Sequence, residues 1–191
     1  AAALDLLRFE EDVPLVGVIE PGLRATIRAT RTGRVGVIGT VGTIASGAYQ
    51  RAAAAWRARG LTLTCAACPG FVEFVERGEL ASDQVLVLAE RLLAPVRDAG
   101  IDTLLLGCTH YPFLARTISD VVGREVVLVS SAEETAFEVR RILEDTGLGR
   151  RTAKDGHRTW ISSGDVAEFR RLGRRLLCPE IDAVVHWSPA T

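Results

Sequence analysis

Short apolar runs bounded by turn-forming residues alternate along this chain with longer segments of helical period. Residues 103–106 form a run of Thr and Leu that stops at Gly107, whereas residues 83–98 place apolar side chains three and four positions apart. Such alternation favours an α/β fold class, in which helices cover parallel sheets. The predicted strands span residues 15–19, 34–38, 61–66, 103–106, 126–130, 159–162 and 183–186.

The helical segments have their own start and stop signals. Gly60, Gly123 and Gly147 each follow an apolar periodic segment, as glycines that end helices do. Ser131 with Glu134 predicts a capping box for the helix that follows. The predicted helices span residues 1–11, 22–31, 44–59, 83–98, 112–122, 132–146 and 166–177, and the polar stretch 148–156 is predicted as a loop.

A thiol and an imidazole stand where the apolar run 103–106 stops, because Cys108 and His110 follow it directly and Pro112 begins the next helix. Ligands of open parallel sheets collect at the carboxyl ends of strands, where a following helix N-terminus offers free N–H groups. We therefore expect Cys108 at an active-site edge, with a thiolate favoured over a thiol. The alternative is that Cys108 is a small buried hydrophobic residue.

Composition narrows the class of protein. The 191 residues allow one large or two small domains, and 48% hydrophobic content is enough for a packed core. A formal net charge of −1 gives no electrostatic footprint for nucleic acid or an anionic membrane, and neither a membrane-spanning run nor a signal-peptide pattern is recognisable. The four cysteines, Cys65, Cys68, Cys108 and Cys178, are too few for a disulfide scaffold, so we expect reduced thiols and a cytoplasmic location.

The run from Gly107 to Pro112, Gly-Cys-Thr-His-Tyr-Pro, resembles the segment around the second catalytic cysteine of cofactor-independent glutamate racemases, in the aspartate/glutamate racemase family. Similarity in order and spacing extends over residues 1–144. Three further segments resemble that family: residues 18–22, residues 35–40 with Thr43 and 46–50, and residues 68–72 with 73–76.

The resemblance implies two facing, doubly wound α/β domains with the substrate between them. Residues 1–21 would end the first domain, residues 22–128 would form the second, and residues 129–191 would return to the first. The family places its first catalytic cysteine, in a Cys-Asn-Thr-like run, just before a helix like residues 1–11, and an Asp-Ser pair still earlier. Neither occurs in this chain. We therefore expect the later two-thirds of a racemase, with an incomplete first domain and no activity of its own.

The chemistry of the family explains why two thiols are needed. Racemisation removes the Cα proton on one face and returns a proton on the other, without a cofactor or a metal to stabilise the carbanion. A thiol suits this task because its ordinary pKa, about 8.5, is within reach of neutral pH. The resemblance implies that the product D-glutamate supplies bacterial peptidoglycan, and with it cell-wall biogenesis and cell shape. It assigns catalysis to Cys108 with the support of His110 and Glu76, and substrate binding to Thr40, Thr43, Thr109 and His110.

Each of these residues has a simpler interpretation. Thr40 and Thr43 could cap a helix, Glu76 could be a solvated charge, and His110 could start a helix. Cys65 and Cys68 have the C-x-x-C spacing of zinc sites, but no second pair exists, so we interpret them as packing residues.

Three other functions stay open. Aspartate racemases and single-cysteine decarboxylases share the superfamily, although a histidine at position 110 favours the glutamate enzymes, since aspartate racemases tend to have a glutamate there. A truncated, non-catalytic binding module is the alternative of a different class.

Apolar faces meant for missing strands would also promote a homo-oligomer or poor solubility.

Overall fold

The computed structural model describes residues 4–10, 13–58, 60–150, 156–177, 181 and 183–188. Contacts divide the chain into two compact units, residues 1–149 and 150–191. The first unit contains the sheet that positions the candidate site.

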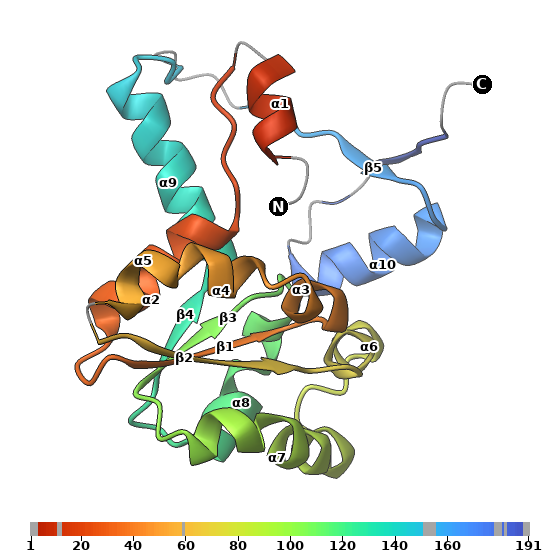
Figure 1. Cartoon of the computed structure of the whole chain (residues 1–191). Coiled ribbons are helices and arrows are strands. Elements are labelled where there is room, and N and C mark those ends of the chain that lie inside the picture. Colours follow the sequence, from red (N-terminus) through yellow and green to blue (C-terminus); the bar gives the residue numbers. More distant parts are fainter. Residues whose placement is uncertain are drawn as a thin grey trace. The chain divides into compact units, whose positions relative to one another are not determined.

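The first unit is built on a four-stranded parallel sheet in the order β2-β1-β3-β4 (Figure 1). The central strands β1 and β3 are buried over almost their whole length, which explains their continuous apolar runs. Ile38 at the end of β1 pairs with Leu106 at the end of β3. The strands are β1 (Arg34–Gly39), β2 (Thr62–Ala67), β3 (Thr103–Leu106) and β4 (Val127–Ser130), each within one residue of its predicted bounds.

Helices cover both faces of this sheet (Figure 1). On one face Tyr49 and Leu105 share a core cluster with side chains from α2 (Ile19–Ala29). On the other face a Cβ on Gly36 would meet Leu104 and Val96, so a glycine lets α7 (Asp83–Asp98) approach β1. The remaining elements of this unit are α1 (Leu4–Glu10), α3 (Val41–Ala45), α4 (Ala48–Ala52), α5 (Ala54–Arg57), α6 (Phe71–Arg77), the 3-10 helix η1 (Tyr111–Leu114), α8 (Ala115–Val122) and α9 (Ser131–Asp145).

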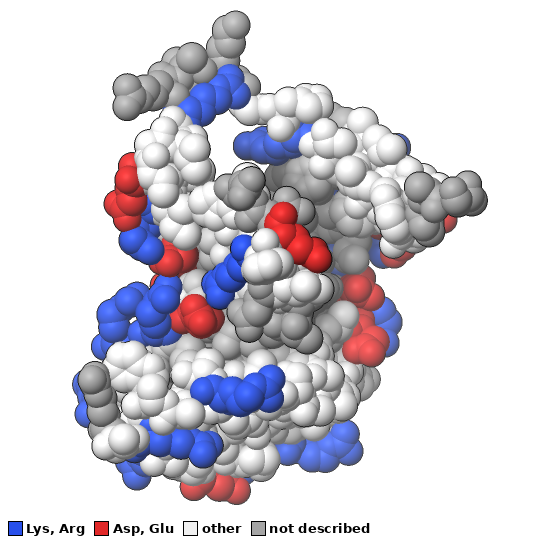
Figure 2. Space-filling model, turned by 45° about the horizontal axis from the view of Figure 1, so that its top comes forward, with Lys and Arg blue, Asp and Glu red and all other residues white. Residues whose placement is uncertain are grey.

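Opposite charges line the surface where α2 packs on α9. Arg24 of α2 lies 3.0 Å from Glu138 of α9, and Arg141 binds the same carboxylate at 2.9 Å. These hydrogen bonds and charges hold the pKa of Glu138 below its usual range. Figure 2 shows red and blue side chains beside one another on the left of this face. Because the arginines are largely exposed, such pairs fix the helix register more than they stabilise the fold.

Two predicted elements are wrong. Residues 14–17, in the predicted strand 15–19, have no regular structure, and α2 begins at Ile19 with Pro21 in its first turn, a position where proline needs no hydrogen bond. The predicted helix 44–59 is instead three short helices, α3, α4 and α5. Gly47, in a left-handed conformation with φ of 65°, separates α3 from α4.

The predicted capping box is also misplaced. The N-cap of α9 is Ser130, whose hydroxyl accepts a hydrogen bond from the N–H of Glu133. Ser131 lies inside the helix and its hydroxyl donates to the carbonyl oxygen of Leu106 at 2.8 Å. This bond is favoured because the carbonyl at the end of β3 is buried and needs a donor.

The second unit contains a parallel strand pair, β5 (Trp160–Ser162) and β6 (Val184–His186), and helix α10 (Val166–Leu176). Asp165 caps α10 by accepting from the N–H of Glu168 at 2.7 Å. A Cβ on Gly173 would lie 2.8 Å from Ile181, so a glycine allows this buried side chain to pack against α10. All three elements agree with the predicted ones, and Cys178 lies outside the described residues.

Candidate active site

The candidate site lies at the point where the strand order of the sheet reverses. From β1 the chain continues through α3, α4 and α5 to β2, and from β3 it continues through α8 to β4, the strand on the opposite side. The carboxyl ends of β1 and β3 therefore flank a topological switch point, the usual ligand position in open parallel sheets. Thr40 directly follows β1 and Cys108 lies two residues after β3. The predicted placement of Cys108 after a strand is confirmed.

The environment of the Cys108 thiol differs from the expected one. Burial raises the pKa of the half-buried thiol, while hydrogen bonds from the backbone N–H groups of His110 and Tyr111 lower it, and burial is the larger effect. The expectation of a readily formed thiolate is therefore wrong for the protein without ligand. It overlooked desolvation, because a sequence does not reveal how deeply a residue after a strand lies.

His110 lies between Cys108 and Glu76. Its Nδ1 is 4.0 Å from the Cys108 sulfur and 3.4 Å from the Thr109 hydroxyl, and its Nε2 is 3.5 Å from a Glu76 carboxylate oxygen. The imidazole and carboxylate side chains are 30% and 49% exposed, so both are open to solvent and to a ligand. The imidazole lies at the outer limit of a hydrogen bond to the thiol, so a small approach of the two groups would let them exchange a proton, and the carboxylate can orient the imidazole.

Aromatic packing positions Glu76 beside His110. Phe71 at the start of α6 meets Tyr111 edge to face, with ring centroids 5.4 Å apart, and the Tyr111 hydroxyl donates to the carbonyl oxygen of Cys68 at 3.0 Å. These contacts fix α6 against η1. The helix itself was not predicted, since it has only seven residues between the left-handed glycines Gly70 and Gly78.

Of the two threonines after β1, Thr40 caps helix α3 and Thr43 lies within that helix. The Thr40 hydroxyl accepts from the N–H of Thr43 at 3.4 Å and lies 2.9 Å from its hydroxyl. The capping interpretation is therefore correct for Thr40. The Thr40 and Thr43 side chains are half-buried at the switch point, where their hydroxyls can still contact a ligand.

The C-x-x-C pair behaves as packing residues. Cys65 and Cys68 are free thiols; burial raises the pKa of both, and that of Cys68 to about 12. Within the described residues, no three His, Cys, Asp or Glu side chains are placed to hold a metal ion. None of the helices in the described part of the chain is long and apolar enough to span a bilayer.

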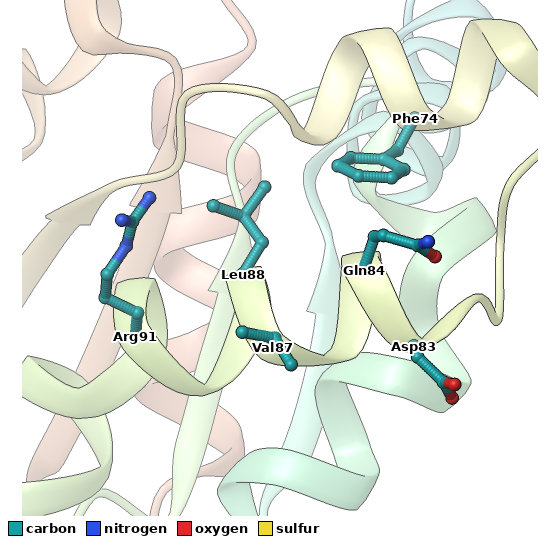
Figure 3. Close-up of a pocket in the computed structure, with 6 residues that line it drawn as sticks. All are labelled: Phe74, Asp83, Gln84, Val87, Leu88 and Arg91. Atoms are coloured by element: carbon teal, nitrogen blue, oxygen red, sulfur yellow. The ribbon is translucent and has the colours of Figure 1, made fainter.

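A separate groove runs between α6 and α7 (Figure 3). Its volume is about 520 Å³, and Phe74 from α6 faces apolar side chains of α7 across it. None of the candidate site residues lines it. The lining residues are Phe74, Asp83, Gln84, Val87, Leu88 and Arg91.

An open parallel sheet with a thiol, an imidazole and hydroxyl groups at its switch point defines a class of α/β protein built for acid–base chemistry on a small ligand. The family model Asp/Glu/Hydantoin racemase matches residues 1–139 of the chain. A glutamate racemase of Acidothermus cellulolyticus is 54% identical over 185 residues, covering 96% of this chain and 70% of the relative.

Solved structures agree with this match. Glutamate racemase isoform RacE1 from Bacillus anthracis superimposes with a TM-score of 0.88 at 35% identity, over 99% of this chain and 69% of that one. Glutamate racemase from Thermus thermophilus, solved with β-chloro-D-alanine, gives 0.81 at 39% identity, over 96% and 66%. The chain therefore belongs to the Asp/Glu/Hydantoin racemase family, among its glutamate racemases. It spans about two thirds of the length of the relatives it matches.

Proposed function

We propose that this chain contains the Cys108 half of a two-thiol glutamate racemase, which interconverts L- and D-glutamate. The observation that supports this most is the line of Cys108, His110 and Glu76 at the switch point of the sheet. In this proposal residues 22–128 form one domain, and residues 1–21 and 129–191 belong to the other. The substrate lies between the two domains.

In the proposed reaction Cys108 serves one face of the substrate Cα. Its thiolate takes the Cα proton of one enantiomer, so that the C–H bond breaks and an S–H bond forms, while an acid on the opposite face delivers a proton to the carbanion. In the reverse direction the Cys108 thiol is the acid. His110 accepts the thiol proton to prepare the thiolate, and Glu76 holds the imidazole in place.

The polar ends of glutamate are bound by hydroxyl and N–H groups in this proposal. Thr40, Thr43 and Thr109 supply hydroxyls at the rim of the sheet, and a hydroxyl can donate to a carboxylate or accept from an ammonium group. The Thermus thermophilus relative binds β-chloro-D-alanine, which shares the α-amino and α-carboxylate groups of glutamate. Similarity to glutamate racemases favours this substrate over that of an aspartate racemase or a decarboxylase.

We further propose a cytoplasmic enzyme whose D-glutamate supplies bacterial peptidoglycan. Apolar side chains such as Phe9, Ile161 and Trp187, which are more than half exposed, favour association into a homo-oligomer. Light scattering of the purified chain tests the last point, and a strictly monomeric chain would contradict it.

The decisive experiment measures optical rotation or circular dichroism of L-glutamate with the 191-residue chain and with a chain extended upstream along its gene. We expect racemisation from the extended chain only, because one-sided proton transfer cannot invert a centre efficiently. In the extended chain, Cys108→Ser should lower turnover by about 100-fold to 10,000-fold, the usual loss for a general acid or base. An inactive extended chain would favour a non-catalytic binding module, and racemisation by the 191 residues alone would contradict the one-sided site.

A further inference from the structure

Tyr49 places a buried hydroxyl beneath the candidate active site. The side chain comes from α4 on one face of the sheet and is 1% exposed. Its hydroxyl lies 2.9 Å from the point that a Cβ on Gly107 would occupy. Gly107 directly precedes Cys108, so the phenol ends against the backbone that positions the thiol.

This hydroxyl has no hydrogen-bond partner in the part of the chain that the structure describes. The other tyrosine provides the contrast, since the Tyr111 hydroxyl donates to the carbonyl oxygen of Cys68. The hydroxyl is not among the fully buried side-chain atoms that lack a partner, so it keeps a small contact with solvent at the site. A phenol that is otherwise enclosed normally finds a hydrogen-bond partner at its polar end. The Tyr49 hydroxyl is therefore available for a group that changes its state during the reaction.

Two thiols lie within electrostatic range of the hydroxyl. Burial, with smaller contributions from the negative charge of Cys65 and Cys108, raises the pKa of Tyr49 to about 12. The phenol thus keeps its proton at any pH at which an enzyme of this kind operates. It can only donate to an anion formed beside it.

We propose that Tyr49 is a positioning residue for Cys108, whose buried hydroxyl donates a hydrogen bond to the thiolate and holds it at the end of β3. This role rests on the proposed function of Cys108 as the acid–base group. It also explains why position 107 is a glycine, since a side chain there would push the hydroxyl away from the thiol. The hydroxyl counteracts part of the desolvation that otherwise disfavours the thiolate.

The test compares the pH dependence of Cys108 alkylation by iodoacetamide in the full chain with Tyr49→Phe, followed residue by residue by mass spectrometry. Loss of a hydrogen bond to a charged group should raise the apparent pKa of Cys108 by about one unit and slow alkylation about tenfold below that pKa. Tyr111→Phe is the matched control. It removes a buried hydroxyl that already has a partner, so the pKa of Cys108 should stay within about 0.3 unit of the original.

Apart from Tyr111, which the control variant replaces, the ionisable groups around this site stay the same in both variants, so the comparison isolates the Tyr49 hydroxyl. If Tyr49→Phe shifts the apparent pKa of Cys65 but not that of Cys108, the hydroxyl acts on Cys65 and the proposal is overturned. The proposal is also overturned if the Cys108 alkylation profile is the same in Tyr49→Phe and in the unchanged chain. The surrounding groups are Cys65, Cys68, Glu73, Glu76, His110 and Tyr111.

A second measurement needs no substitution of Tyr49. The chain has two tyrosines, so carbon-13 at tyrosine Cζ gives two resonances. The Tyr49 resonance should shift as Cys108 titrates and stop doing so in Cys108→Ser; a resonance indifferent to Cys108 would contradict the hydrogen bond. Neither readout uses glutamate. A shifted thiol pKa in a protein whose extended form does not racemise would keep the role of Tyr49 and overturn only the racemase function.

Discussion

The Glu76 carboxylate lies 3.5 Å from Nε2 of His110, on the opposite side of the imidazole from the Cys108 thiol. The two residues come from different elements, α6 and the turn before η1, and they meet because Phe71 packs on Tyr111. An imidazole held by a carboxylate at one nitrogen presents its other nitrogen in a defined direction. Glu76 is therefore expected to orient His110 rather than to contact the substrate itself.

Replacing Glu76 by Gln should lower glutamate turnover of the upstream-extended chain by about tenfold or more, less than the loss of an acid–base group itself. Glu79→Gln is the control, because Glu79 lies just beyond the same helix and pairs with Arg77 instead. Initial rates of racemisation at saturating glutamate decide the matter. Equal rates in Glu76→Gln and the unchanged chain would reduce Glu76 to a solvated charge.

Gly107→Ala should destabilise the fold. The added Cβ would lie 2.8 Å from the carbonyl oxygen of Ile38 and 2.9 Å from the Tyr49 hydroxyl, both too close for real contacts. Overpacking of this kind costs about 1 to 3 kcal/mol of unfolding free energy.

Gly42→Ala is the matched control for this substitution. A Cβ on Gly42 meets no atom within 4 Å, and alanine there favours helix α3. Urea unfolding of both variants should show a lower midpoint for Gly107→Ala only. A Gly107→Ala protein as stable as Gly42→Ala would mean that the end of β1 and Tyr49 adjust freely.

The placement of Cys108 could be predicted from sequence because each signal was local. The apolar run 103–106 and the proline at position 112 bracket a turn after a strand, and β3 and η1 lie there. Helix α7 matches its predicted bounds of 83–98 for the same reason, since Ser82 caps it and a long apolar period follows.

Non-local features could not be predicted in this way. The Glu76–His110 pair and the hydroxyl of Tyr49 against Gly107 depend on how α6 and α4 pack, which no spacing along the chain encodes. The raised pKa of Cys108 has the same origin, because burial by neighbouring elements outweighs the local N–H groups. The strand expected at residues 15–19 is wrong because Ile19 begins an amphipathic helix, while residues 14–17 take no regular structure.

Asp102 links the start of β3 to the turn before β1, at the edge of the sheet opposite the candidate site. Its carboxylate accepts hydrogen bonds from the Thr30 hydroxyl and from the N–H groups of Arg31 and Thr32. Burial alone would raise the pKa of this carboxyl, but these hydrogen bonds together outweigh burial and hold the pKa well below its usual range. The ionised form is therefore the one that the folded state stabilises.

Asp102→Asn should lower the unfolding free energy by about 2 kcal/mol at pH 7, since hydrogen bonds to a charged group are lost. The folded pKa is depressed, so the stabilisation is complete above the ordinary pKa of about 4 and is lost as the pH falls towards the folded value. Urea unfolding should show a smaller difference from the unchanged chain at pH 3 than at pH 7. Asp98→Asn, at an exposed pair with Arg97, should change little at either pH. A difference that widens in acid would contradict the assignment.

Reactivity of the cysteines tests whether Cys108 is a chemical group or a packing residue. Burial raises the pKa of all three described thiols, but not equally. Cys68 is 1% exposed and has a pKa of about 12. Cys108 is half-buried, and hydrogen bonds from two backbone N–H groups lower its pKa. Cys65 lies within strand β2 and lacks such donors. Thiolate fraction and access both control alkylation, so iodoacetamide at pH 8 should modify Cys108 first and Cys68 last.

We expect Cys108 also to react faster than Cys178, and excess glutamate to slow its modification in the extended protein without affecting the other thiols. Mass spectrometry of timed samples gives all four rates from one protein, so the cysteines serve as controls for one another. If Cys108 is alkylated most slowly of the four cysteines, desolvation keeps the thiol protonated and unreactive. Its position at the switch point of the sheet then has no chemical consequence. The proposed racemase mechanism would then lose its base.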